Sequence, residues 1–94
     1  MYIIYLRVEC DPAKNEINVA KHGVPLVAAE KFDWDTALVA EDDRFDYGER
    51  RFYALGYIGD RLHTLIYADG SDEDSIRAIG LWLSVRSEVK RYEA

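Results

Sequence analysis

Three segments between residues 51 and 83 constrain the fold of this chain most strongly. The segments 51–58, 62–68 and 76–83 are rich in aromatic and β-branched side chains, which is typical of strands. Gly59-Asp60 separates the first two and fits a two-residue type II′ hairpin turn, and an acidic segment at 69–74 separates the second from the third. Because short turns join antiparallel neighbours, the sequence predicts an antiparallel meander here.

A short helix with both ends marked comes earlier in the chain, at residues 11–24. Asp11 is a suitable N-cap, and Pro12 then takes the first helical position, where its missing N–H costs nothing. Gly23 is suited to the left-handed conformation that ends many helices. Apolar residues at helical spacing predict one buried stripe: Ala13, Ile17, Ala20 and Val24.

The remaining segments complete a mixed fold. Residues 2–8 are typical of a first strand, residues 26–32 fit a second short helix that packs Leu26, Ala29 and Phe32 inward, and residues 33–47 are polar and irregular with a short extended piece at 38–40. Ser84 is suited to cap a closing helix whose expected buried face is Val85, Val89 and Tyr92. The order β-α-α-β-β-β-α predicts an α+β fold: an antiparallel sheet packed with N-terminal helices and a C-terminal helix, in one domain covering residues 1–94.

Composition narrows the function classes. No apolar run approaches the roughly 20 residues of a membrane span, and the first residues lack the basic segment of a signal peptide. The one cysteine, Cys10, cannot form an internal disulfide, so we expect a cytoplasmic protein that does not contact membranes. A net charge of −6 argues against a general nucleic-acid binder and suits a basic protein partner. The acidic side chains are concentrated at residues 30–49, however, so a locally basic site elsewhere in the chain is compatible with the net charge.

Lys21 and His22 lie in the last turn of the predicted helix and have two interpretations. They complement the negative end of the helix dipole, an effect worth about 0.3–1 kcal/mol. Alternatively, a Lys-His pair beside a glycine turn is offered to the anionic group of a ligand. Spacing and composition leave both interpretations open.

The chain resembles the BrnT family of small RelE-like ribonuclease toxins from type II toxin–antitoxin operons. The resemblance rests on these residues: Asp11-Pro12-Ala13-Lys14-Asn15, Asn18, Lys21-His22-Gly23-Val24, Phe32-Asp33, Glu41-Asp42-Asp43-Arg44, Tyr47-Gly48-Glu49, Arg51, Ala54-Leu55-Gly56, Ile76-Arg77, Ile79 and Glu88-Val89-Lys90-Arg91-Tyr92-Glu93. It implies a RelE-like fold and a metal-independent RNA endonuclease without a cofactor. It further implies a BrnA-type antitoxin in a 2:2 assembly, with operator DNA contacted only through that antitoxin.

RNA cleavage by internal attack needs a base for the 2′-hydroxyl proton, an acid for the leaving 5′-oxygen and cations for the charged phosphorane. Carried onto this sequence, the resemblance implies His22 as the acid–base group and Glu49 as an orienting partner or second base. Arg77 joins them in the catalytic set through its contact with the phosphate, and Lys21 and Arg51 bind the RNA phosphates. His63 is less favoured, because a mid-strand histidine is more often a sheet residue.

Strand alternation limits where these side chains point. Arg51, Tyr53 and Leu55 are expected on one face, as are His63, Leu65 and Tyr67. In the last strand, regular alternation places Arg77 with Ile79, Leu81 and Leu83. An arginine among apolar neighbours either pairs with a carboxylate such as Glu49 or reaches over a cleft.

The chain departs from the family pattern at the end of the last predicted strand. Relatives usually carry Ser, a small or apolar residue, then Arg-Lys-Ala, whereas this chain has Gly80-Leu81-Trp82-Leu83-Ser84. The loss of two cations predicts weak or absent ribonuclease activity. An alternative is therefore a non-catalytic antitoxin-binding module that takes part in operon autoregulation. A metal-dependent nuclease built on Glu41-Asp42-Asp43 is a weaker alternative, since a solvated loop explains that cluster more simply.

Overall fold

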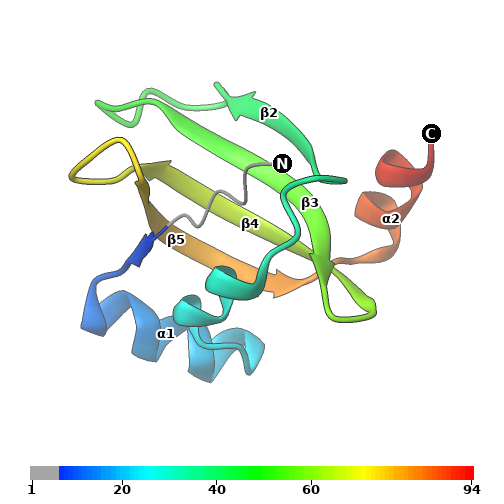
Figure 1. Cartoon of the computed structure of the whole chain (residues 1–94), viewed down its shortest axis with the longest axis horizontal. Helices are drawn as coiled ribbons and strands as arrows, with labels where there is room; N and C mark the ends of the chain where they lie inside the picture. Colours follow the sequence, from blue (N-terminus) through cyan, green and yellow to red (C-terminus); the bar gives the residue numbers. More distant parts are fainter. Residues whose placement is uncertain (1–6) are drawn as a thin grey trace.

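A five-stranded sheet in the order β1-β5-β4-β3-β2 is the centre of the computed structural model, which describes residues 7–94 (Figure 1). The elements are β1 (Arg7–Glu9), α1 (Pro12–His22), the 3-10 helix η1 (Leu26–Lys31), β2 (Leu38–Asp42), β3 (Arg51–Ile58), β4 (Arg61–Asp69), β5 (Ser75–Leu83) and α2 (Arg86–Glu93). The antiparallel meander of β3, β4 and β5 confirms the strands predicted between residues 51 and 83. The mixed α+β class is confirmed as well.

The two edge strands of the sheet differ from the elements predicted for these segments. β2 is a full strand antiparallel to β3, with Ala40 opposite Tyr53, where we expected only a short extended piece. At the other edge β1 runs parallel to β5, with Val8 opposite Ile76. The predicted first strand at 2–8 overlaps β1 at residues 7 and 8, and its remaining residues lie outside the described part. The observed order over residues 7–94 is therefore β-α-η-β-β-β-β-α.

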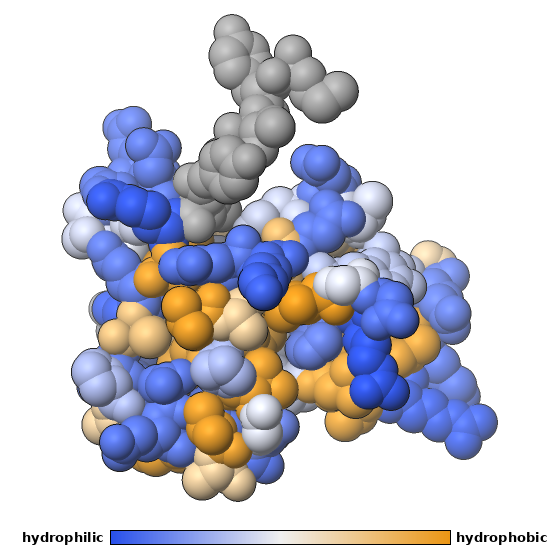
Figure 2. All heavy atoms as spheres, turned by 60° about the horizontal axis from the view of Figure 1, so that its bottom comes forward, coloured by the Kyte–Doolittle hydropathy of each residue, from blue (hydrophilic) through white to orange (hydrophobic). Residues whose placement is uncertain are grey.

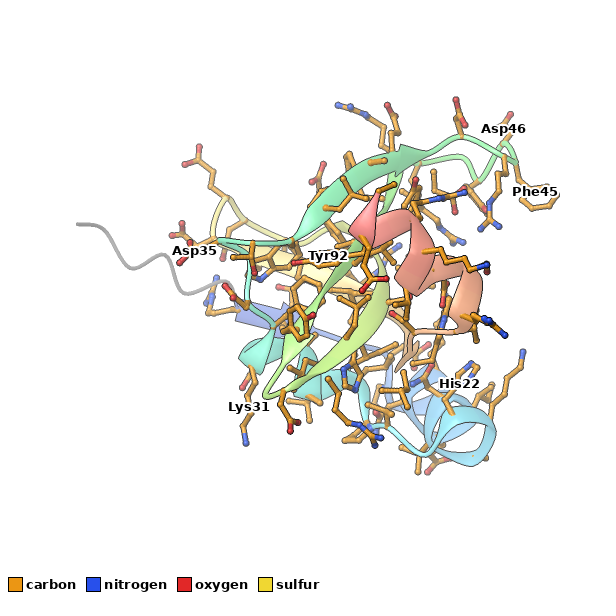
Figure 3. The ribbon with its side chains drawn as sticks, turned by 90° about the vertical axis from the view of Figure 1, so that its right-hand side faces the viewer. His22, Lys31, Asp35, Phe45, Asp46 and Tyr92 are labelled. Carbon is orange, nitrogen blue, oxygen red and sulfur yellow. The ribbon has the colours of Figure 1, made fainter. Side chains whose placement is uncertain are left out.

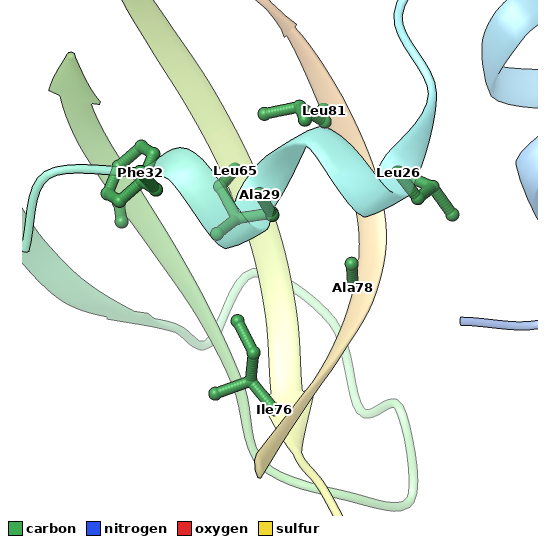
Figure 4. Close-up of a cluster of buried hydrophobic side chains, with 8 residues drawn as sticks. Leu26, Ala29, Phe32, Leu65, Ile76, Ala78 and Leu81 are labelled. Atoms are coloured by element: carbon green, nitrogen blue, oxygen red, sulfur yellow. The ribbon is translucent and has the colours of Figure 1, made fainter. Parts of the chain in front are cut away.

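One face of the sheet is covered by η1, which crosses β3, β4 and β5 (Figure 4). Leu26, Ala29 and Phe32 point inward from it as predicted, although the helix is 3-10 and not α. They pack on a buried cluster that includes Leu65 and Leu81, both fully buried. This cluster is the main hydrophobic core. The opposite face of the sheet takes no part in it.

The predicted apolar stripe is wrong within α1, where Ala13, Ile17 and Ala20 are exposed and amide side chains make the contacts; Val24, just after the helix, does pack against the core. Ile17 is 65% exposed, and Ala13 is exposed as well. Asn18 is buried instead: its Nδ2 donates to the carbonyls of Val24 and Leu81, each at 2.8 Å, and its Oδ1 accepts the Leu81 N–H at 3.2 Å. β1 pairs only with the first residues of β5, so the later part of β5 has a free edge. Asn18 covers that edge and docks α1 beside it.

A β-bulge in β5 changes which side chains share a face. Ile66 pairs with Gly80 and Tyr67 with Ala78, so the intervening residue Ile79 has no direct partner on β4. The extra residue reverses the alternation between Arg77 and Trp82. Arg77 lies opposite Ala68 of β4 and Trp82 lies opposite Thr64. Both side chains are therefore on the face of the sheet away from η1. The expectation that Arg77 shares a face with Leu81 is therefore wrong.

The closing helix α2 lies over the end of the open face through polar contacts and an edge-to-face contact of Tyr92 with Tyr57; none of its side chains is fully buried, but Val89 and Tyr92 are half-buried as part of the predicted face. The Tyr92 hydroxyl donates to the Thr36 carbonyl at 2.9 Å, and Arg91 donates to the Tyr53 hydroxyl at 3.0 Å. Two expectations fail here. The helix begins after Val85, which is 55% exposed, and the Ser84 hydroxyl forms a 2.9 Å hydrogen bond with that of Thr64 in place of a cap.

Candidate functional site

The face of the sheet opposite η1 is only partly covered and carries two grooves. The α2 groove, of about 410 Å³, lies between α2 and the end of β2. The α1 groove, of about 340 Å³, lies between α1 and β5. Trp82 and Ile66 line both grooves, so these two side chains form the wall between them.

Glu49 holds two arginines together on this face. Arg77 donates to Glu49 Oε2 in a short ion pair, and Arg51 Nε donates to the same oxygen at 3.2 Å. The Arg51 guanidinium also lies 4.2 Å from the centre of the Tyr47 ring. Of the two alternatives for Arg77, pairing with a carboxylate or reaching over a cleft, the structure shows the pair with Glu49. The hydrogen bond from Arg77, with a second from Arg51, lowers the pKa of Glu49 below its ordinary value. A carboxylate with a lowered pKa is a weak base, so this arrangement favours the orienting role over that of a second base.

Lys21 and His22 stand together at the other end of the face, where α1 ends. Asp11 caps the start of α1 by accepting the Ala13 N–H at 3.0 Å, and Gly23 ends it in the left-handed region with φ of 73°, as predicted. The imidazole of His22 packs on the indole of Trp82, with 5.3 Å between ring centres and 35° between planes. Lys21 and His22 are exposed and line the α1 groove.

The predicted site residues therefore form two groups. Glu49, Arg51 and Arg77 make one cluster, and Lys21 and His22 make another. Arg77 and Trp82 are five residues apart, so β5 separates the two groups by roughly 15 Å. In Figure 3 the tip of the loop between β2 and β3, labelled at Phe45 and Asp46, lies apart from His22.

Trp82 is the residue of this face whose contacts sequence reasoning missed. Its indole N–H donates to Glu88, at 3.1 and 3.3 Å from the two carboxylate oxygens. Its ring passes close to Gly80, where an added Cβ would lie 3.1 Å from Cζ3. Gly80 and Trp82 therefore fit each other in this chain. The sequence marked these positions as unusual but carried no sign that Trp82 meets His22.

The acidic segment at the end of β2 has its own partners. Asp42 is buried and accepts from Arg44 Nε at 2.8 Å and from the Tyr47 hydroxyl at 3.2 Å. Arg44 lowers the pKa of Asp42, chiefly by this hydrogen bond. Glu41 pairs with Arg50 at 3.0 Å. Within residues 7–94 no three His, Cys, Asp or Glu side chains are grouped so that they could hold a metal ion.

Comparison with known proteins assigns the class of this chain. Residues 10–88 match a family model described as the ribonuclease toxin, BrnT, of type II toxin-antitoxin systems. The chain therefore belongs to the BrnT family, and the resemblance seen in its sequence is confirmed. A toxin of this type implies an antitoxin partner. No curated protein matches the chain. In the described part of the chain, no helix is long and apolar enough to cross a membrane.

Proposed function

We propose that this protein is an RNA endonuclease toxin that cleaves RNA without a metal ion and is neutralised by a BrnA-type antitoxin. The family match over residues 10–88 carries this proposal. It is supported by the open face of the sheet, which presents His22 and Lys21 at one end and the Arg51–Glu49–Arg77 cluster at the other. An RNA strand that lies along β5 meets both groups.

In the proposed reaction, the 2′-oxygen of one nucleotide attacks the adjoining phosphorus and the 5′-oxygen leaves. This gives a 2′,3′-cyclic phosphate and a free 5′-hydroxyl. His22 accepts the proton of the 2′-hydroxyl as it attacks, and the leaving 5′-oxygen takes its proton from water. Arg77 and Arg51 lie roughly 15 Å from His22 along β5, so they bind a phosphate further along the RNA strand, since the planar guanidinium matches two phosphate oxygens. Glu49 holds both arginines in place, and Lys21 binds a neighbouring phosphate.

The proposed activity is weak in this chain. Relatives carry two cations where Trp82 and Leu83 stand, and these cations would stabilise the charged transition state. Trp82 instead supplies an apolar ring, and its indole N–H is engaged by Glu88. Arg77 and Arg51 are also partly neutralised by their shared carboxylate.

The proposed domain organisation, location and assembly are those expected for the family. The 94 residues act as one RelE-like toxin domain in the cytoplasm, in a 2:2 assembly with the antitoxin, which is the only component that contacts operator DNA. The negative net charge suits a basic antitoxin.

Cleavage of a structureless RNA by the pure protein, with a chelator present, tests the proposal. We expect slow cleavage that His22→Ala abolishes. The matched control is His63→Ala, because His63 is the other histidine of the chain and its Nδ1 is already within 2.9 Å of the Arg61 carbonyl. Equal loss in both variants, or cleavage that the chelator stops, would contradict the proposed site.

A second variant tests the reason for weak activity. The triple change Gly80→Ser, Trp82→Arg and Leu83→Lys restores the residues usual in the family. We expect it to raise the cleavage rate by about 10²-fold, the effect typical of one added transition-state donor. If neither the starting protein nor the triple variant cleaves RNA, the chain is not a ribonuclease.

A further inference from the structure

The α1 groove has a composition unlike the rest of this acidic protein. Ile17, Ile66 and Ile79 give it apolar walls, and the rings of Trp82 and His22 meet in it. Its charged side chains, Lys14 and Lys21 on α1, are both cationic, and within residues 7–94 no carboxylate lines it. The net charge of the chain is −6, so this groove is a local exception.

The most exposed large apolar side chain of α1, that of Ile17, belongs to this groove. Ile17 is 65% exposed because the amide contacts of Asn18 turn the apolar stripe of the helix away from the core. Figure 2, in which the α1 side of the molecule comes forward, shows apolar atoms among hydrophilic ones on this surface. Lys14 and Lys21 are seven residues apart, about 10 Å along the helix, and lie on either side of Ile17.

We propose that the α1 groove binds one unpaired nucleobase of RNA against Trp82, with the adjoining phosphates on Lys14 and Lys21. This inference rests on the proposed ribonuclease function and names a subsite for its substrate. An unpaired base has a flat apolar face that stacks on an aromatic ring, and its two flanking phosphates need separate cations. The groove supplies both kinds of group in that arrangement.

The α2 groove supports this placement because it disfavours the RNA backbone. It is lined by four carboxylates and two arginines: Glu41, Asp42, Asp43, Glu88, Arg44 and Arg91. Asp42 and Glu41 are paired with Arg44 and Arg50, so the groove keeps only a small excess of negative charge, which disfavours phosphate. Trp82 forms part of the wall between the two grooves, so an RNA strand is directed to the α1 side. The change from a cation to Trp82 thus exchanges a phosphate contact for a base contact.

Binding of a six-nucleotide, fully 2′-O-methylated RNA, measured by fluorescence anisotropy, tests this inference without cleavage. We expect Trp82→Leu to weaken binding by about 5- to 100-fold, the range for the loss of one base–aromatic stack, and Trp82→Phe to retain most of the affinity. An abasic oligomer with the same phosphates should bind Trp82→Leu and the starting protein equally. Thermal unfolding by circular dichroism verifies that each variant is folded.

The lysines provide the second arm of the experiment. Lys14→Ala and Lys21→Ala should weaken binding of the normal and abasic oligomers alike, and each should reduce the slope of log affinity against log salt by about 0.7. Lys31→Ala is the matched control, because Lys31 is an exposed lysine that lies far from His22 (Figure 3). It should change neither affinity nor slope.

The outcomes separate this inference from the proposed function. If Trp82→Leu binds RNA as tightly as the starting protein, or loses equal affinity for the abasic oligomer, the nucleobase subsite is wrong, whatever the cleavage assay gives. The subsite is also wrong if Trp82→Leu weakens only the binding of a protein partner. Base-dependent binding through Trp82 without any cleavage would support the subsite and overturn the ribonuclease.

Discussion

Asn18 pairs with the backbone of Leu81 as a neighbouring strand would. The Asn18 amide donates to the Leu81 carbonyl at 2.8 Å and accepts the Leu81 N–H at 3.2 Å. One side chain thus satisfies both backbone groups at the free edge of β5. Because the third bond of Asn18 goes to the carbonyl of Val24, just after α1 ends, the same amide fixes the position of Lys21 and His22 over the open face.

The first prediction is that Asn18→Ala lowers the free energy of unfolding by about 2–4 kcal/mol. The change leaves the N–H and the carbonyl of Leu81 buried without partners, and each orphaned group costs about 1–3 kcal/mol. Denaturant unfolding at neutral pH measures the effect. Ile17→Ala on the preceding position of α1 is the control, and we expect its effect to stay within about 0.5 kcal/mol because Ile17 is exposed. Similar losses from both changes would show that α1 docks through apolar packing.

This pairing shows why the orientation of α1 was not predictable. The caps at Asp11 and Gly23 are local, and both were predicted correctly. The helix periodicity pointed to Ile17 as a buried residue, since apolar stripes usually face the core. The competing effect is an unpaired strand edge that needs hydrogen bonds, and this edge exists because β1 ends at Glu9, opposite Arg77 of β5. Such a need arises from tertiary structure and has no local signal.

The candidate site, like the orientation of α1, was predictable only where its features are local in the sequence. The turns and β-branched runs of β3, β4 and β5 are local features, and the Glu49–Arg77 pair was one of the two alternatives that charge chemistry offered for Arg77. The bulge at Ile79 adds one residue without a recognisable sequence sign, and it moved Arg77 to the face of Trp82. The contact between His22 and Trp82 joins two distant elements, so it depended on both the bulge and the docking of α1.

The second prediction concerns the fit between Gly80 and Trp82. Gly80→Ser alone should lower the free energy of unfolding by about 1–3 kcal/mol, because the new Cβ lies 3.1 Å from the indole and forces the ring to move. The same change in a Trp82→Leu background should cost much less. A double-mutant cycle by thermal unfolding gives the coupling energy between the two positions. A coupling near zero would mean that the ring adjusts freely.

The third prediction is that the Asp42–Arg44 pair stabilises the fold in a pH-dependent way. The pKa of Asp42 is lowered in the folded state, so its contribution is present above the ordinary pKa of an aspartate, about 4, and is lost as the pH falls through the lower folded value. Arg44→Gln should cost about 1–3 kcal/mol at pH 7, since it leaves the buried carboxylate without its main partner. The difference from the starting protein should shrink below pH 4 in urea unfolding curves. A constant difference down to pH 2 would contradict this origin.

The fourth prediction separates the two roles considered for Glu49. Glu49→Gln keeps the shape of the side chain but removes the charge that holds Arg77 and Arg51. As an orienting residue it should reduce kcat/KM for RNA by about 10- to 100-fold through misplacement of the arginines. The lowered pKa of Glu49 keeps it ionised at neutral pH, so the shape of the pH–rate profile should not change. Disappearance of the acidic limb of the profile in Glu49→Gln would instead identify Glu49 as the base.

The last prediction is that α2 opens more readily than the sheet. The helix has no fully buried side chain and is held by a few polar contacts and the edge-to-face contact of Tyr92 with Tyr57; the Tyr92–Thr36 bond lies at its C-terminal end. Such elements open locally at a lower free energy than a core strand such as β4. Amide hydrogen exchange should therefore be faster in α2 than in β4, and Tyr92→Phe should accelerate it about 2- to 10-fold in α2 alone, as expected for the loss of one hydrogen bond. Faster exchange throughout the sheet in this variant would mean that α2 unfolds together with the core.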